Sequence, residues 1–224
     1  QFAIRQEHCA MKVGTDGVLL GSWADVSSAH SILDIGTGTG LIALMVAQRC
    51  NAHITALEID IETASQATEN IEASTWKERI QVINCALQEF TNNNSFDFII
   101  SNPPYFNHSL KSPQQERTTA RHTETLSYAE LLDGVNRLLQ PDGRFAVILL
   151  FQEKLNFYHL AEHHQLYPCR ETIIYSTPHS QPKRFMAEFQ HKKIDFEPQS
   201  LIIEAYGRHQ YSEEYKKLTE EFYL

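Results

Sequence analysis

The chain has 224 residues, of which 42% are hydrophobic and 10% aromatic, a composition typical of a folded globular protein rather than a disordered one. This length predicts one mid-sized α/β domain. No apolar run reaches the roughly 18 residues needed to cross a bilayer, and no signal segment is recognisable. Cys9, Cys50, Cys85 and Cys169 are scattered and form no C-x-x-C pair, which favours reduced thiols in a cytoplasmic protein over disulfides or a zinc site.

The net charge of −9 argues against a broad basic surface of the kind that most nucleic-acid-binding proteins present. Positive residues gather locally in two groups. The first contains Lys111, Arg117 and Arg121, and the second contains Lys183, Arg184, Lys192 and Lys193. Each group is either a basic patch on an acidic body or a solvated loop, and the sequence leaves both interpretations open.

Strand and helix patterns alternate along the first part of the chain. Short apolar runs predict strands at Ser31–Ile35, His53–Leu57, Ile80–Cys85 and Phe96–Ser101. Helical periodicity predicts helices at Leu41–Cys50 and Ile61–Ser74. Ser127 and Glu130 have the S-x-x-E form of a capping box that opens another helix. The turn Pro141-Asp142-Gly143 is expected to lead into a fifth strand, Arg144–Leu150.

The last third of the chain departs from this alternation. Gln152–His164 is expected to be helical, Glu171–Tyr175 and Arg184–Gln190 are candidate strands that would pair antiparallel, and a final helix is expected at about Ser212–Phe222. The fold class is therefore α/β, with a mostly parallel, seven-stranded sheet, helices on both faces and an antiparallel edge pair. In such sheets ligands bind beyond the carboxyl ends of the strands, where the strand order reverses.

A glycine-rich turn, Asp34-Ile35-Gly36-Thr37-Gly38-Thr39-Gly40, joins the first predicted strand to a helix. Glycines allow a ligand to approach the backbone closely, and a helix start offers unpaired N–H donors. A dinucleotide-binding G-x-G-x-x-G motif would need glycine where Leu41 stands. Asp34 could instead receive a cationic amino group, and Glu58, at the end of the second strand, suits the hydroxyls of a ribose.

A second motif, Asn102-Pro103-Pro104-Tyr105, follows the fourth predicted strand directly, so both turns are expected to face one crevice. The Asn102 side-chain carbonyl and the Pro103 backbone carbonyl can accept hydrogen bonds from an NH₂ group and direct its lone pair at a methyl donor. Two prolines stiffen the turn. Tyr105 offers a flat face on which a base stacks, worth roughly 1–3 kcal/mol.

Both turns resemble motifs of a known enzyme class. The D-x-G-x-G-x-G turn resembles motif I of the S-adenosylmethionine-dependent methyltransferases, and N-P-P-Y resembles motif IV of those that act on amino groups. The stretch from Cys9 to Gly21 and the segment from Tyr211 to Leu224 are similar to the ends of the bacterial tRNA1(Val) (adenine(37)-N6)-methyltransferase family. The resemblance runs nearly end to end and implies a Rossmann-like class I methyltransferase fold.

The resemblance implies a function and a set of site residues. The function is transfer of a methyl group from S-adenosylmethionine, giving S-adenosylhomocysteine, to adenine 37 beside the tRNA anticodon, in the cytoplasm. The implied catalytic residues are Asn102, Pro103, Pro104 and Tyr105. The implied cofactor-binding residues are Thr15, Asp34, Gly36, Thr37, Gly38, Gly40, Glu58, Ile59 and Asn102. The implied substrate-binding residues are Tyr105, Arg117, Arg121 and His122.

The implied domain organisation is one methyltransferase domain over residues 1–224, in which residues 1–21 lie over the cofactor and residues 201–224 form a C-terminal strand and helix extension. Thr15 and Asp16 would sit at the cofactor's methionine end, although a Thr-Asp-Gly stretch before an apolar run equally indicates a helix cap. The acidic contact to the cofactor's adenine that is common in the superfamily would fall near Ala86, which leaves Asn84 or Gln88 as substitutes.

Several alternatives stay open from the sequence. The acceptor could be guanine N2 in rRNA or a protein glutamine, although enzymes acting on glutamine carry a helical N-terminal domain for which this chain has no room. The chain could also be a non-catalytic module that binds the cofactor or RNA. His159 and His163 are spaced i, i+4 but lack an H-E-x-x-H arrangement, so we expect no metal site.

Overall fold

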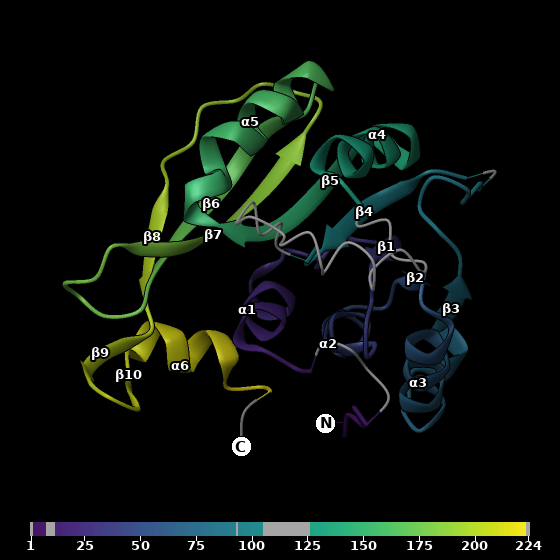
Figure 1. Cartoon of the computed structure of the whole chain (residues 1–224), viewed down its shortest axis with the longest axis horizontal. Helices are drawn as coiled ribbons and strands as arrows, with labels where there is room; N and C mark the ends of the chain where they lie inside the picture. The colour runs from purple at the N-terminus through teal and green to yellow at the C-terminus, as the bar shows by residue number, and fades with distance from the viewer. Residues whose placement is uncertain (1, 8–11, 93, 105–125, 223–224) are drawn as a thin grey trace, which may run out of the picture.

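An eight-stranded sheet dominates the computed structural model, which describes residues 2–7, 12–92, 94–104 and 126–222 (Figure 1). Its strands are β1 (Ser31–Ile35), β2 (His53–Glu58), β3 (Ile80–Asn84), β4 (Phe96–Ser101), β5 (Leu139–Leu150), β6 (Tyr167–Tyr175), β7 (Pro182–Gln190) and β8 (Gln199–Ile202). Their order is β3-β2-β1-β4-β5-β7-β6-β8. A separate two-stranded sheet pairs β9 (Glu204–Gly207) with β10 (Gln210–Tyr211).

The predicted direction of the strands is confirmed. The pairs among β1, β2, β3, β4 and β5 are parallel, and β7 runs antiparallel to both β5 and β6. The sheet has one strand more than the seven we expected, because β8 pairs parallel with β6 and forms the edge. The chain builds the sheet outward from β1 in one direction and from β4 in the other, so the strand order reverses between these two neighbours.

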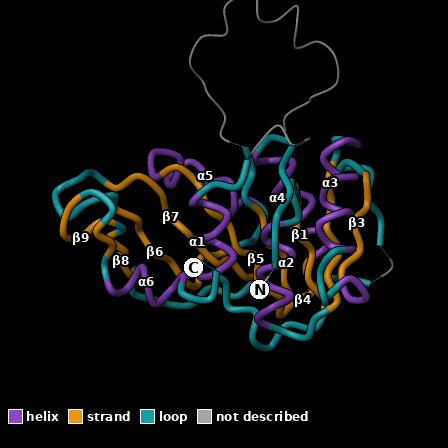
Figure 2. Tube along the Cα trace, turned by 90° about the horizontal axis from the view of Figure 1, so that it is seen from below, coloured by secondary structure: helices purple, strands orange, loops and turns teal. Residues whose placement is uncertain are grey.

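Helices cover both faces of the sheet. They are α1 (Thr15–Trp23), α2 (Leu41–Arg49), α3 (Ile61–Glu72), α4 (Tyr128–Leu138), α5 (Lys154–His163) and α6 (Glu213–Thr219), with short 3-10 turns η1 (Lys77–Arg79) and η2 (Phe151–Glu153). One apolar core lies under α1, α2, α3 and α6, and the other lies under α4 and α5. Figure 2 views the molecule from the side on which α1, α2 and α6 lie.

Local sequence signals explain where several helices begin. The Ser127 hydroxyl accepts a hydrogen bond from the Glu130 backbone N–H at 3.2 Å, and the Glu130 carboxylate accepts one from the Ser127 N–H at 2.8 Å. The predicted capping box is therefore confirmed. Asp60 caps α3 by accepting from the Thr63 N–H at 2.8 Å. The last helix is shorter than predicted: Ser212 caps it, and it ends at Thr219.

The predicted turn before the fifth strand needs correction. Residues 141–143 lie inside β5, which begins at Leu139. The register with β4 shifts there, because Phe96 pairs with Leu139 whereas Phe98 pairs with Arg144. A Cβ on Gly143 would lie 2.8 Å from the Leu139 side chain, so the chain does bend sharply at this point. The Pro-Asp-Gly signal thus marks an irregularity within a strand rather than a separate turn.

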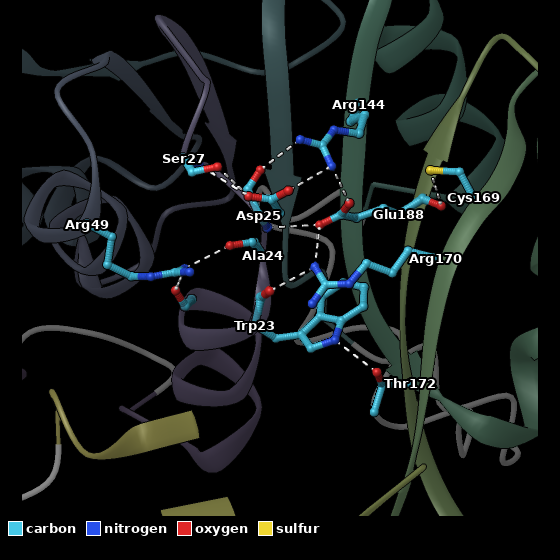
Figure 3. A network of polar contacts seen from close by, with 11 residues as sticks. Trp23, Ala24, Asp25, Ser27, Arg49, Arg144, Cys169, Arg170, Thr172 and Glu188 are labelled. Carbon is cyan, nitrogen blue, oxygen red and sulfur yellow. Dashed lines mark hydrogen bonds and ion pairs between the residues drawn. The ribbon is translucent and has the colours of Figure 1, made fainter. Parts of the chain in front are cut away.

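A charge network around the buried Glu188 fixes one end of α1 to the sheet (Figure 3). Glu188 of β7 has 0% exposure and accepts hydrogen bonds at 3.1 Å from Arg144 and from Arg170, and at 2.9 Å from the Asp25 backbone N–H just beyond α1. The Arg170 guanidinium lies 4.1 Å from the centre of the Trp23 ring. Because α1 is anchored at this end, its first turn is held at the rim where β4 ends.

Candidate active site

The glycine turn leaves β1 in a conformation that suits glycine. Gly36, Gly38 and Gly40 have φ values of 71°, 58° and 80°, in the left-handed region that other residues rarely adopt. The N–H groups of Gly36 and Thr37 both donate to the Leu57 carbonyl at 2.9 Å, which ties the turn to β2. A Cβ on Gly36 or Gly38 would meet no atom within 4 Å. The turn therefore borders open space, from which a ligand can approach the backbone.

Asp34 lies behind this turn and is fully buried. Its Oδ2 accepts a hydrogen bond from the Thr37 hydroxyl at 2.6 Å, whereas Oδ1 is buried with no hydrogen-bond partner among the described residues. Burial raises the pKa of Asp34 to about 7, against the opposing effects of the Thr37 hydrogen bond and of the nearby Ala43 backbone N–H. A buried carboxylate favours a cationic group beside it, and Asp34 orders the turn through its hydrogen bond with Thr37.

Glu58 stands beside the turn at the end of β2. Its carboxylate accepts hydrogen bonds from the backbone N–H of Gly38 at 2.9 Å and from that of Asp60 at 3.1 Å. The neighbouring Ile59 side chain is 54% exposed, unusual for a large apolar residue. An acid and an exposed aliphatic side chain next to an open glycine turn match the hydroxyls and the flat base of a nucleoside.

Asn84 and Gln88 were candidates to replace the missing acidic contact, and both have other partners. The Asn84 side-chain amide donates to the carbonyls of Glu58 and Ile59, each at 2.9 Å. Gln88 donates to Glu130 at 3.2 Å. Asn84 therefore holds the backbone that carries Glu58. The sequence alone did not reveal this role, because it depends on the register in which β2 pairs with β3.

The turn that begins at Asn102 leaves β4 directly beside the point where the glycine turn leaves β1. Ile35 of β1 is paired with Ser101 of β4, and the Ser101 hydroxyl donates to the Ile35 carbonyl at 2.9 Å. Asn102 follows and is half-buried, Pro103 is buried and Pro104 is exposed. The two turns leave adjacent strands side by side at the carboxyl rim, so their predicted adjacency is confirmed.

The first turn of α1 completes this side of the site. A Cβ on Gly17 would lie 3.8 Å from the Asn102 amide nitrogen. Thr15 is exposed, and Asp16 accepts a hydrogen bond from Arg184 of β7 at 3.0 Å. A helix begins here as expected, but its N-cap is Gly14, so neither Thr15 nor Asp16 is the N-cap residue.

Four predicted site residues, Tyr105, Arg117, Arg121 and His122, lie outside the described residues. The second basic group of the sequence is divided between the two ends of β7. Lys183 and Arg184 lie at its start, beside Asn102, where they line a cavity of about 490 Å³. Sequence reasoning did not place them at the site, because only the pairing of β7 with β5 and β6 brings them there. Within the described part of the chain, no group of three or more His, Cys, Asp or Glu side chains could hold a metal ion.

Comparison with known proteins agrees with this geometry. The family model described as methyltransferase small domain matches residues 9–163. A relative from Bacteroides fragilis strain YCH46, named tRNA1(Val) (adenine(37)-N6)-methyltransferase, is 50% identical over 227 aligned positions, which cover 100% of this chain and 95% of the relative. The chain belongs to this methyltransferase family. A relative of the same name from Phocaeicola vulgatus is 50% identical over 224 positions, again with 100% and 95% covered.

A solved structure supports the fold of this methyltransferase. It is a predicted O-methyltransferase from Agrobacterium tumefaciens, with a TM-score of 0.74, 18% identity, and coverage of 92% of this chain and 96% of that one. The similarity confirms the Rossmann-like methyltransferase fold. No helix in the described part of this methyltransferase is long and apolar enough to cross a membrane.

Proposed function

We propose that this chain transfers a methyl group from S-adenosylmethionine to the exocyclic N6 of adenine 37 in tRNA1(Val). The observation that carries the proposal is the pairing of Ile35 with Ser101, which sets the glycine turn and the Asn102 turn next to each other. The relatives' shared name supports the choice of acceptor. A donor held by one turn and an amine held by the other would then meet between two adjacent strand ends.

The described residues fit S-adenosylmethionine, whose sulfonium methyl is the electrophile when it is bound. The open faces of Gly36 and Gly38 would admit it, and the buried Asp34 carboxylate behind the turn would stabilise its cationic amino group. Glu58 would accept from the ribose hydroxyls and Ile59 would contact the adenine. The proposed set also includes Thr15, Thr37, Gly40 and Asn102. Residues 1–21 would lie over the cofactor. The chain would form a single domain of residues 1–224, in which residues 201–224 are a C-terminal strand and helix extension.

Asn102 and Pro103 would hold the acceptor. Two carbonyls that accept from the N6 amino group orient its lone pair, and the rigid Pro103-Pro104 backbone fixes its position. Tyr105 would stack on the base, which must leave its loop to enter the site, at a cost of a few kcal/mol. No strong general base is required, because the amino proton becomes acidic once the nitrogen is methylated.

The finer features of the substrate complex are also proposals. The partner would be the anticodon region of the tRNA in the cytoplasm, and Arg117, Arg121 and His122 would contact it. Guanine N2 of rRNA and glutamine of a protein are the alternative acceptors of the same chemical class.

The test is methylation of an unmodified tRNA1(Val) transcript with labelled cofactor, followed by mass spectrometry of the nucleosides. We expect N6-methyladenosine from the wild-type protein and none from a transcript with guanine at position 37. We expect Asn102→Ala to lower kcat by about 10²–10³, as loss of one positioned hydrogen-bonding group does, with cofactor affinity unchanged within a few-fold. The exposed Asn51→Ala is the matched control. Methylated guanine, or an equal loss of kcat and cofactor affinity in Asn102→Ala, would contradict the proposal.

A further inference from the structure

A cavity of about 490 Å³ opens beside Asn102 on the side of the sheet where β5, β7 and β6 lie. Its walls come from the segment before α1, from the first turn of α1, from the rim ends of β6 and β7, and from Ile203 after β8. Two of its lining residues, Thr15 and Asn102, belong to the proposed site, whereas within the described part of the chain the glycine turn and Glu58 do not line it. The cavity therefore extends the site beyond Asn102 toward β6 and β7.

The charge of this cavity is opposite in sign to that of the protein. Lys12, Lys183 and Arg184 line it, against one acid, Asp16, which is paired with Arg184 at 3.0 Å. Lys12 and Lys183 are exposed. On a chain of net charge −9, a cavity with two exposed lysines beside a salt-bridged arginine is a local positive region.

The start of α1 adds to this positive potential. The first N–H groups of a helix have no partner within the helix, and the helix dipole favours an anion at this end. The N-cap of α1 is Gly14, which has no side chain with which to cap these groups. Gly14, Thr15 and Gly17 all line the cavity. Backbone donors and two lysines thus face the same space, which is the combination that binds phosphate groups.

We propose that this cavity binds the phosphodiester backbone of the RNA next to the target adenine, with Lys12 and Lys183 as the phosphate-contacting residues. The inference rests on the proposed function. A base that has left its loop to reach Asn102 brings its flanking phosphates close to the same turn. Phosphate contacts supply most of the affinity of a nucleic-acid complex and set its register, while the pocket around Asn102 selects the base.

Strand β7 supplies a matched control. Lys183 stands at its rim end, whereas Lys192 and Lys193 follow Gln190 at its other end. The double variants Lys12→Gln/Lys183→Gln and Lys192→Gln/Lys193→Gln therefore change the net charge equally, one pair at the cavity and the other away from it. The substituted lysines are exposed, so both proteins are expected to fold with the wild-type melting temperature.

The experiment measures binding of the full-length protein to an unmodified tRNA1(Val) transcript over a range of salt concentrations, in the presence of S-adenosylhomocysteine. We expect the cavity variant to bind about tenfold or more weakly. We also expect the slope of log affinity against log salt to become shallower by about 0.7–0.9 for each phosphate that the variant no longer neutralises. The control variant should keep both the wild-type slope and the wild-type affinity for the cofactor.

Each other outcome overturns the assignment. A wild-type slope in the cavity variant, with methyl transfer by the wild-type protein intact, would overturn the role of the cavity alone. Loss of cofactor affinity with an unchanged slope would show that the lysines bind the cofactor's carboxylate instead. Failure of the wild-type protein to methylate tRNA would overturn the proposed function, and this inference with it.

Discussion

Substitution of Gly38 by alanine tests whether the glycine turn binds the cofactor, because its expected effect on stability is small and can be measured independently of its effect on binding. Gly38 has φ of 58°, which costs an L-residue about 1–2 kcal/mol. At roughly 2–4 °C per kcal/mol for a chain of this size, the melting temperature should fall by about 2–8 °C. The added Cβ meets no protein atom within 4 Å, so no further loss of stability is expected.

Gly38→Ala should weaken cofactor binding by more than the backbone strain at this position alone would. The new methyl group projects into the space through which S-adenosylmethionine would approach the backbone. We expect the Kd of the cofactor, measured by calorimetry, to rise about tenfold or more, equivalent to about 1.4 kcal/mol. The backbone N–H that donates to Glu58 is retained in the variant. A loss of cofactor affinity would therefore come from the methyl group filling the space next to residue 38, and not from loss of that hydrogen bond.

Gly143→Ala is the matched control for this prediction, because Gly143 lies near the start of β5, at the opposite end of the sheet from the glycine turn. A Cβ there would lie 2.8 Å from the Leu139 side chain, and such overpacking costs about 1–3 kcal/mol. It should lower the melting temperature by a similar amount and leave the Kd of the cofactor within twofold of wild type. Wild-type cofactor affinity in Gly38→Ala, together with the expected loss of stability, would refute the assignment of this turn as the cofactor site.

Three further predictions concern carboxyl groups. Glu58→Gln removes charged hydrogen bonds worth about 1.5–3 kcal/mol and should raise the Kd of the cofactor about 10- to 100-fold in calorimetry; an unchanged Kd would exclude Glu58 from the site. Glu188→Ala removes the carboxylate that the partly exposed Arg144 and Arg170 share and should cost about 1.5–3 kcal/mol in urea unfolding, whereas the exposed Glu162→Ala should cost under about 0.5 kcal/mol. Burial raises the folded-state pKa of Asp34 to about 7, so its contribution to stability is present below about pH 4 and is lost as the pH rises through 7. The melting temperature of Asp34→Asn should therefore not show this fall between about pH 4 and 7. Melting temperatures that change with pH in the same way in the two proteins would contradict the prediction.

Much of the fold follows from local sequence signals. β1 and β4 have the predicted bounds, because each is a buried apolar run that stops at glycine or proline. The helix at α4 begins where its capping box predicts. The adjacency of the two turns also followed from sequence, since parallel strands direct their carboxyl ends to one rim.

The features that sequence did not reveal depend on pairing between distant segments. β8 is short and mostly exposed, with a single buried residue, Leu201, so it carries no alternating apolar pattern and is specified by its pairing with β6. Lys183 reaches the site only through the register of β7. Glu188 is one acid among many in the sequence, and its burial between Arg144 and Arg170 requires three strands to be in place.

The acidic composition of the chain and its proposed RNA substrate are compatible because electrostatic interactions between exposed charges decay over about 8 Å at physiological salt. The potential at the cavity is therefore set mainly by Lys12, Lys183 and the salt-bridged Arg184, and only weakly by acids elsewhere. The few cations at the cavity imply few phosphate contacts there, and so only a partial share of the salt dependence shown by proteins that make six to ten such contacts. The remaining contacts would come from Arg117, Arg121 and His122, so neutralising the cavity should make the salt dependence shallower without abolishing it.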